Sequence, residues 1–160
     1  MDAIKLLEQQ HDEVTDLFES IEKARSRERR SELFTRLADA LAIHAMIEEK
    51  IFYPTVKAKR SEDIPLESLA EHLAVKHVLA DLLDVDVDDP SFAIKLDVLR
   101  EEAERHFKDE RTELFPQVRK IFDKEILEEL GAQMETLTAD LEGTSPRETV
   151  PYQIDQAPTI

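Results

Sequence analysis

Apolar side chains recur along the chain in steps of three and four residues, the spacing that places them on one face of an α-helix. This spacing predicts a first helix over residues 2–24, with an inner face made of Ile4, Leu7, His11, Val14, Phe18 and Ile21. A second helix is predicted to begin near Arg29, with an inner face made of Leu33, Leu37, Leu41, His44, Glu48 and Ile51.

Two breaks in the pattern separate two further helices. The sequence SEDIP at 61–65 ends the second helix, and Pro65 suits the first turn of a third, whose face carries Leu69, His72, Val75, Leu79 and Leu82. The sequence DVDDPS at 86–91 precedes a fourth helix with Phe92, Leu96, Leu99, Ala103, His106, Glu110 and Leu114. Pro54 and Pro116 are expected to kink or end the second and fourth helices at a similar depth.

Four amphipathic helices joined by short breaks predict an all-α fold, an antiparallel up-down four-helix bundle. A fifth helix over about 124–141 is expected either to cover this bundle or to serve in self-association. The segment 143–160 has three prolines and little apolar pattern, so it is predicted to be an extended or disordered tail. The expected organisation is one domain over 1–142 followed by that tail.

The composition agrees with a single helical domain, and it excludes some classes of binding partner. The 160 residues include only two glycines, and the formal net charge is -16. Such a surface repels nucleic acid and anionic membranes, so neither is expected as a partner. The absence of cysteine excludes disulfides and thiolate metal sites. Without a signal-peptide pattern or a long apolar run, we expect a cytoplasmic monomer or homodimer.

The four predicted inner faces each contain a histidine, and two of them also contain a glutamate. An unpaired carboxylate in an apolar core costs several kcal/mol, so positive charge should lie opposite it. Residues four apart lie one turn apart on the same side of a helix. His44 with Glu48, and His106 with Glu110, can therefore each reach one point inside the bundle.

These pairs belong to a repeated phrase, HAMIEEKIFYP from His44 and HFKDERTELFP from His106. His11 and His72 precede the two phrases by 33 and 34 residues, so the sequence predicts two copies of one helical hairpin. Paired around a pseudo-twofold axis, the copies bring four imidazoles and two carboxylates together. That donor set suits two bridged ions of iron, manganese or zinc, and such pairs in bundles are typically iron or manganese. A purely structural polar core is the alternative.

At these residues the chain resembles the hemerythrin-like (HHE cation-binding) domain family, over roughly residues 4–141. The resemblance rests on His11, HAMIE at 44–48, EHLAVK at 71–76 and HFKDE at 106–110. It implies two iron ions beside an oxo or hydroxo bridge, with manganese or zinc as alternatives. The implied metal ligands are His11 and His44 on one ion, His72 and His106 on the other, and the bridging Glu48 and Glu110.

The chain departs from the family's oxygen carriers at Lys76, where they place a second histidine on the third helix. His77 follows, but a residue five positions after His72 points elsewhere on an ideal helix, so His77 is expected outside the site. The missing ligand can be supplied by water, Glu49, Tyr53 or Glu113. Glu113, seven residues after His106, is expected to face the interior as a pocket carboxylate, either an added ligand or a proton relay. The alternative is that it reaches solvent near the end of the bundle. Tyr53 is expected to pack in the core.

The resemblance implies a protein that binds or reacts with dioxygen, hydrogen peroxide or nitric oxide. A site with one imidazole fewer favours catalase- or peroxidase-like turnover over reversible carriage. The alternative is an iron- or oxygen-sensing or iron-storage module without turnover, in which the fifth helix and tail pass on the signal. A helical interaction domain without metal conflicts with two glutamates on inner faces.

Overall fold

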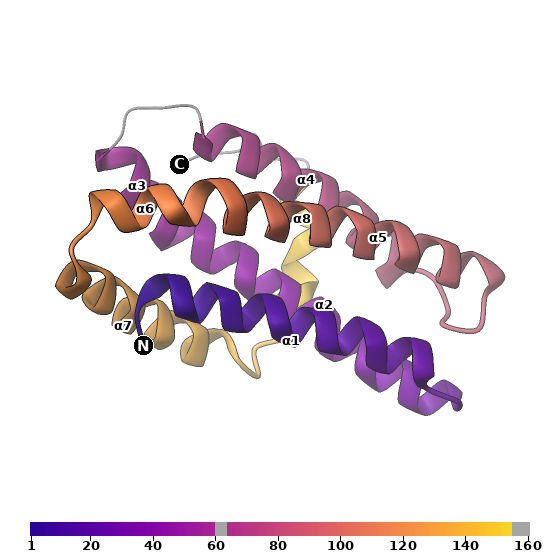
Figure 1. Cartoon of the computed structure of the whole chain (residues 1–160). Coiled ribbons are helices and arrows are strands. Elements are labelled where there is room, and N and C mark those ends of the chain that lie inside the picture. The colour runs from indigo at the N-terminus through magenta and orange to yellow at the C-terminus, as the bar shows by residue number, and fades with distance from the viewer. Residues whose placement is uncertain (60–63, 155–160) are drawn as a thin grey trace.

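The computed structural model describes residues 1–59 and 64–154, and every regular element in these ranges is a helix. Four rods form the antiparallel bundle predicted from the sequence (Figure 1). The rods and their helices are α1 (Ala3–Lys23), α2 (Arg27–Ile47) continuing into α3 (Tyr53–Lys59), α4 (Ile64–Leu83), and α5 (Pro90–Asp109) continuing into α6 (Phe115–Ile121). The predicted fifth helix is α7 (Lys124–Leu141).

Local capping explains where three of these rods begin. The Asp2 carboxylate accepts a hydrogen bond from the Lys5 amide at 2.9 Å, and the Ser26 hydroxyl accepts one from the Arg29 amide at 3.1 Å. Asp89 caps α5 in the same way, with Pro90 in the first turn. Each cap satisfies an amide that lacks a partner within its helix.

The second and fourth rods continue past their prolines through single turns of π-helix. These turns are η1 (Glu48–Phe52) and η2 (Glu110–Leu114). In each, the N–H of the last residue before the proline donates to the carbonyl of the glutamate five residues earlier. The α-helical pattern thus ends at Ile47 and Asp109, as a break before proline requires, but the rod does not stop. The extra residue in each π turn rotates the side chains that follow it about the helix axis, compared with their positions on an unbroken α-helix.

Two apolar cores fill the bundle, and a polar layer separates them. One core contains the C-terminal half of α1, around Phe18, and the N-terminal half of α2, around Leu37. The other contains the N-terminal end of α1, around Ile4, together with Phe52 and residues of α6 and α7. His11 lies on α1 between these two sets, which places the polar layer midway along the rods.

The helix α7 packs against the N-terminal part of α1, where Figure 1 shows it beside the start of the chain. Its buried residues are Leu127, Leu130, Gly131 and Met134. A Cβ added at Gly131 would lie 2.1 Å from the carbonyl oxygen of Met1 and 2.9 Å from the amide nitrogen of Ala3. The glycine therefore permits the two backbones to approach closely, and α7 covers the bundle. Self-association through α7 stays a prediction.

The segment after α7 differs from the predicted tail. Residues Pro146–Thr149 form a 3-10 turn (η3) and Val150–Gln153 a short helix (α8). Arg147 anchors this segment through two hydrogen bonds from Nη1 to the Asp39 carboxylate, at 2.9 and 3.1 Å. Val150 is buried in the first apolar core. The prediction of an extended or disordered tail is therefore wrong up to residue 154, because this ion pair and one apolar contact suffice to fix the segment. Residues 155–160 lie outside the described residues.

A membrane-spanning helix is not found in the described ranges, where none of the helices combines the necessary length and apolar character.

Replacing Gly131 with alanine should destabilise the protein. Alanine improves helix propensity by about 1 kcal/mol, but the added methyl group collides with backbone atoms of α1, at a cost of about 1–3 kcal/mol. We expect a lower urea midpoint for Gly131→Ala. The matched control is Gln133→Ala, at an exposed position of α7, where the midpoint should change little. A midpoint for Gly131→Ala at or above the wild-type value would contradict this packing.

Candidate metal centre

The six side chains expected to bind metal lie together in the polar layer. Each is at most 4% exposed, and the four histidines come from four different rods. The set is His11 on α1, His44 and Glu48 on the second rod, His72 on α4, and His106 and Glu110 on the fourth rod. These donors form two clusters that share Glu48, each compact enough for one ion.

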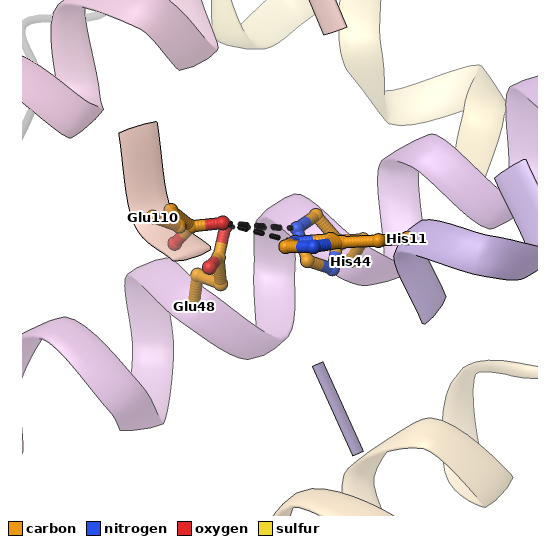
Figure 2. Close-up of side chains that lie close together, drawn as sticks. All are labelled: His11, His44, Glu48 and Glu110. Carbon is orange, nitrogen blue, oxygen red and sulfur yellow. Dashed lines mark hydrogen bonds and ion pairs between the residues drawn. The ribbon is translucent and has the colours of Figure 1, made fainter. Parts of the chain in front are cut away.

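The first cluster contains His11, His44, Glu48 and Glu110. Figure 2 shows two imidazoles on one side and two carboxylates on the other, pointing toward one another. The Nε2 of His11 lies 3.0 Å from Glu110 Oε1, and the Nε2 of His44 lies 3.0 Å from Glu48 Oε1. The His11 ring also stacks on Phe107, at 4.0 Å between centroids, which fixes its plane.

The second cluster contains Glu48, His72 and His106. The Nε2 atoms of the two histidines lie 3.0 Å apart, and they lie 2.8 and 3.2 Å from Glu48 Oε1. The Nε2 of His106 also lies 3.3 Å from Glu110 Oε1. Both glutamates therefore contact nitrogens from both clusters, as bridging carboxylates must.

The spacing of these atoms fits metal ions. Two ligands bound to one ion at about 2.1 Å and at right angles lie about 3.0 Å apart, which matches the separations in both clusters. Three buried polar atoms lack a hydrogen-bond partner among the described residues, and two of them, His44 Nε2 and Glu48 Oε2, belong to the clusters. A cation would engage such atoms. The donor set, imidazole with carboxylate, suits iron, manganese or zinc.

Tyr53 packs in the second apolar core, as expected from the sequence, and its hydroxyl also reaches the site. Its hydroxyl donates to Glu110 Oε2 at 2.9 Å and lies 3.2 Å from His72 Nε2, and its side chain is fully buried. The π turn explains this placement, because one extra residue per turn carries Tyr53 to the inner face. The sequence did signal Tyr53, as the aromatic residue before Pro54, but it did not signal the π turn.

The same rotation removes Glu113 from the interior. On an unbroken α-helix it would nearly eclipse His106, but η2 intervenes, and Leu114 and Phe115 are buried in its place. The Glu113 side chain is exposed, so the expectation that it faces the interior is wrong. A role in proton relay stays a prediction. His77 is exposed on α4, which is α-helical throughout, as expected of a residue outside the site.

The outer nitrogens of three histidines have partners that the sequence did not predict. Each is the Nδ1 atom, which points away from the clusters. His44 Nδ1 lies 2.8 Å from the amide oxygen of Gln10, His72 Nδ1 lies 2.9 Å from Glu49 Oε2, and His106 Nδ1 lies 3.2 Å from Glu71 Oε1. Such contacts fix the orientation of an imidazole that binds metal.

Electrostatics in the metal-free site place positive charge opposite the glutamates. Burial acts to lower the pKa of His44, but the charges of Glu48 and Glu110 outweigh it and raise this pKa to about 9. Burial likewise opposes the shift at His106, yet Glu110 and Glu48 raise its pKa well above the usual value. For His11 burial prevails and lowers the pKa. Imidazolium ions thus supply the charge that a metal would otherwise supply.

Two openings adjoin the clusters. A pocket of about 360 Å³ has a polar lining that includes the buried Glu110 together with Glu71, Asp109 and Glu113. A smaller cavity of about 20 Å³ is mostly apolar and borders His44, His72 and His106, with Val150 among its lining residues. The first can admit water and small polar molecules, and the second has room for about one water-sized molecule.

A helical bundle that buries four histidines and two glutamates in two compact clusters defines a metal-binding protein of the bundle class. Residues 2–118 match the family model described as the hemerythrin HHE cation binding domain. The chain therefore belongs to the hemerythrin HHE cation-binding family, which confirms the resemblance noted in the sequence. The helices α7 and α8 lie beyond the matched residues.

The chain is also similar to two known proteins. The crystal structure of a hemerythrin HHE cation binding domain-containing protein from Mycobacterium kansasii has a TM-score of 0.79 and 25% sequence identity, and it covers 99% of this chain and 95% of its own. A protein of Nostoc sp. named DNA nickase is 21% identical over 142 residues. That match covers 89% of this chain but only 40% of the Nostoc protein.

The metal-free protein should lose stability as the pH rises from about 6.5 to about 9. The folded-state pKa of His44 is raised to about 9, so its contribution is complete below the unfolded value of 6.5 and is lost as the pH passes through 9. The loss is on the order of 3 kcal/mol. Urea unfolding of chelator-treated protein at several pH values measures it. Constant or rising stability across this window would contradict the charge balance described above.

Proposed function

We propose that the chain binds two iron ions and that this pair reacts with hydrogen peroxide, dioxygen or nitric oxide, with peroxide as the favoured substrate. The observation that carries the proposal is the pair of buried clusters sharing Glu48. In this proposal His11 and His44 hold one ion, His72 and His106 hold the other, and Glu48 and Glu110 lie between them. Manganese or zinc are the alternative metals.

The two glutamates and four histidines have distinct tasks in this proposal. Glu48 and Glu110 offset the charge of the ions, and the neutral imidazoles hold the ions at the outer ends. A bound iron pair supplies two electrons by cycling between ferrous and ferric states. The six side chains come from four packed rods and are buried, which would restrict their movement during that change.

Tyr53 supports a reaction that needs protons. Burial raises the pKa of its hydroxyl well above the usual value, and the charges of Glu110 and Glu48 act in the same direction. The hydroxyl therefore stays protonated in the metal-free site and donates a hydrogen bond to Glu110 Oε2, with 2.9 Å between the two oxygens. A bound cation would offset the carboxylate charges that raise this pKa and would make the hydroxyl a better proton donor. A proton donor at this position suits the cleavage of an oxygen–oxygen bond more than reversible carriage of dioxygen.

Access from solvent favours a small polar substrate. The pocket of about 360 Å³ includes Glu110 among its lining residues, and Glu113 and Asp109 line it too. We propose that peroxide and water enter by this pocket and that Glu113 passes protons along it. The exposed position of Glu113 suits such a relay, since it can exchange protons with water directly.

Nucleic acid is not part of the proposed function. The nicking activity named for the Nostoc protein belongs to a chain of which this one spans 40%. A net charge of -16 repels the phosphate backbone, and binding to DNA depends on neutralising that charge. The same charge argues against an anionic membrane surface, and the cytoplasmic location expected from the sequence stays a prediction.

One observation favours a second candidate function, an iron or oxygen sensor. Val150 of α8 lines the small cavity beside His44, His72 and His106. Movement of these rings on metal binding would therefore change the packing of the C-terminal segment. In that case the residues after Leu141 should be cleaved by protease at different rates with and without metal. Equal rates argue against sensing.

Substitution of either bridging glutamate should abolish the ion pair. We expect Glu48→Ala and Glu110→Ala to fall from about two ions per chain to well under one, because Glu48 belongs to both clusters and Glu110 Oε1 contacts His11 of the first and His106 of the second. The control is His77→Ala, at an exposed position, which should keep both ions. Elemental analysis and the absorption spectrum of aerobic protein measure this. Full iron content in the glutamate variants would refute the bridge.

Iron-loaded protein should release oxygen from hydrogen peroxide, and the rate should depend on Tyr53. We expect Tyr53→Phe to slow release by about 100-fold, the size of a typical general acid–base contribution. Tyr152→Phe is the matched control, because Tyr152 is 76% exposed and outside the site. An oxygen electrode follows the reaction. Wild-type protein that releases no oxygen, and that binds and releases dioxygen reversibly after reduction, would identify a carrier or sensor.

A further inference from the structure

The second cluster differs from the first in the groups that contact the outer Nδ1 atoms of its histidines. The outer nitrogen of His72 lies 2.9 Å from a carboxylate oxygen of Glu49, and that of His106 lies 3.2 Å from a carboxylate oxygen of Glu71. Glu71 is itself hydrogen-bonded to Asp109. Both imidazoles of this cluster are therefore backed by negatively charged groups.

In the described part of the chain, no carboxylate contacts the outer nitrogens of the histidines in the first cluster. The outer nitrogen of His44 contacts the amide oxygen of Gln10 at 2.8 Å, which orients the ring but carries no net charge. The outer nitrogen of His11 has no hydrogen-bond partner in the described part of the chain. Its ring is held by stacking on Phe107 instead.

Lys76 holds Glu49 in place behind His72. Its ammonium nitrogen lies 2.9 Å from Glu49 Oε1 and 2.8 Å from Glu49 Oε2, while Oε2 also contacts His72. The lysine is only 9% exposed, although its length would allow it to reach water from many surface positions. Burying an ammonium ion is costly unless it is paired, so the contact with Glu49 is what keeps Lys76 inside.

Apart from Glu110, which belongs to the first cluster alone, the ligand atoms do not separate the two positions. Glu48 Oε1 lies 3.0 Å from His44 Nε2 and 2.8 Å from His72 Nε2. Glu110 Oε1 lies 3.0 Å from His11 Nε2 and 3.3 Å from His106 Nε2. Both carboxylates thus approach imidazoles of both positions, and each position has two imidazoles, so the difference that remains beyond Glu110 lies in the groups behind the histidines.

A carboxylate behind an imidazole changes its strength as a ligand. It keeps the proton on Nδ1, directs the Nε2 lone pair toward the ion, and makes that lone pair more basic. We propose that the two ion positions are unequal and that Glu49, held by Lys76, is a positioning residue that makes the His72–His106 position the tighter one. The inference rests on the proposed ion pair. It also gives Lys76 a role without making it a ligand.

Cobalt(II) binding to the metal-free full chain tests this inference without any activity assay. Calorimetry and the visible absorption of bound cobalt should resolve two steps in wild-type protein, and His72→Ala should abolish the tighter one. We expect Glu49→Gln to weaken the tighter step by 10- to 100-fold, the usual effect of removing such a partner, and to leave the other step unchanged. Lys76→Met should weaken the same step by a smaller factor.

A reciprocal variant keeps the test decisive if Glu49→Gln folds poorly, which urea unfolding of the metal-free variant would reveal. Gln10→Glu places a carboxylate behind His44, so the weaker step should tighten and the two steps should converge. A single step of equal affinities in the wild type, or equal weakening of both steps by Glu49→Gln, overturns the inference. A wild-type chain that binds fewer than two cobalt ions refutes the proposed ion pair itself.

Discussion

Two carboxylates buried between apolar cores are the constraint on which this bundle depends. Glu48 and Glu110 are at most 1% exposed, and either one alone would cost several kcal/mol to keep ionised there. Compensation requires positive charge at the same depth. In the metal-free chain it comes from His44 and His106, whose pKa values the glutamates raise. The convergence of side chains from all four rods follows from this requirement.

The two π turns serve the same requirement, and the residue that follows each turn makes the two halves differ. Each begins at a buried glutamate and ends just before a proline, so the repeated phrase specifies both the anion and the helical irregularity beside it. At the equivalent inward position one half has Tyr53, which donates to Glu110, and the other has Phe115, which stacks near the His11 ring. A duplicated scaffold thus encloses an asymmetric interior.

Sequence periodicity predicted the rods, their order and the six buried polar side chains, because all of these follow from spacing along regular helix. It failed where the helix is irregular. The contact of the Tyr53 hydroxyl with Glu110 and the exposure of Glu113 depend on one extra residue in each π turn, which no three- or four-residue spacing contains. The contacts of Glu49 with His72 and of Glu71 with His106 were not predicted. Charged residues on half-exposed helix faces have the same sequence pattern whether or not a histidine of a neighbouring helix lies close to them. The folded segment after residue 143 rests on contacts between distant parts of the chain, the ion pair of Asp39 with Arg147 across more than 100 positions and the burial of Val150 in the first core.

The division of ligands between the two hairpins bears on how the protein is made. The N-terminal hairpin contains His11, His44 and Glu48 but lacks Glu110, and the C-terminal hairpin contains His72 and His106 but lacks Glu48. Neither cluster is complete until both hairpins have docked. A ribosome-bound chain that has emerged only as far as α4 cannot complete either cluster, because His106 and Glu110 lie on the fourth rod.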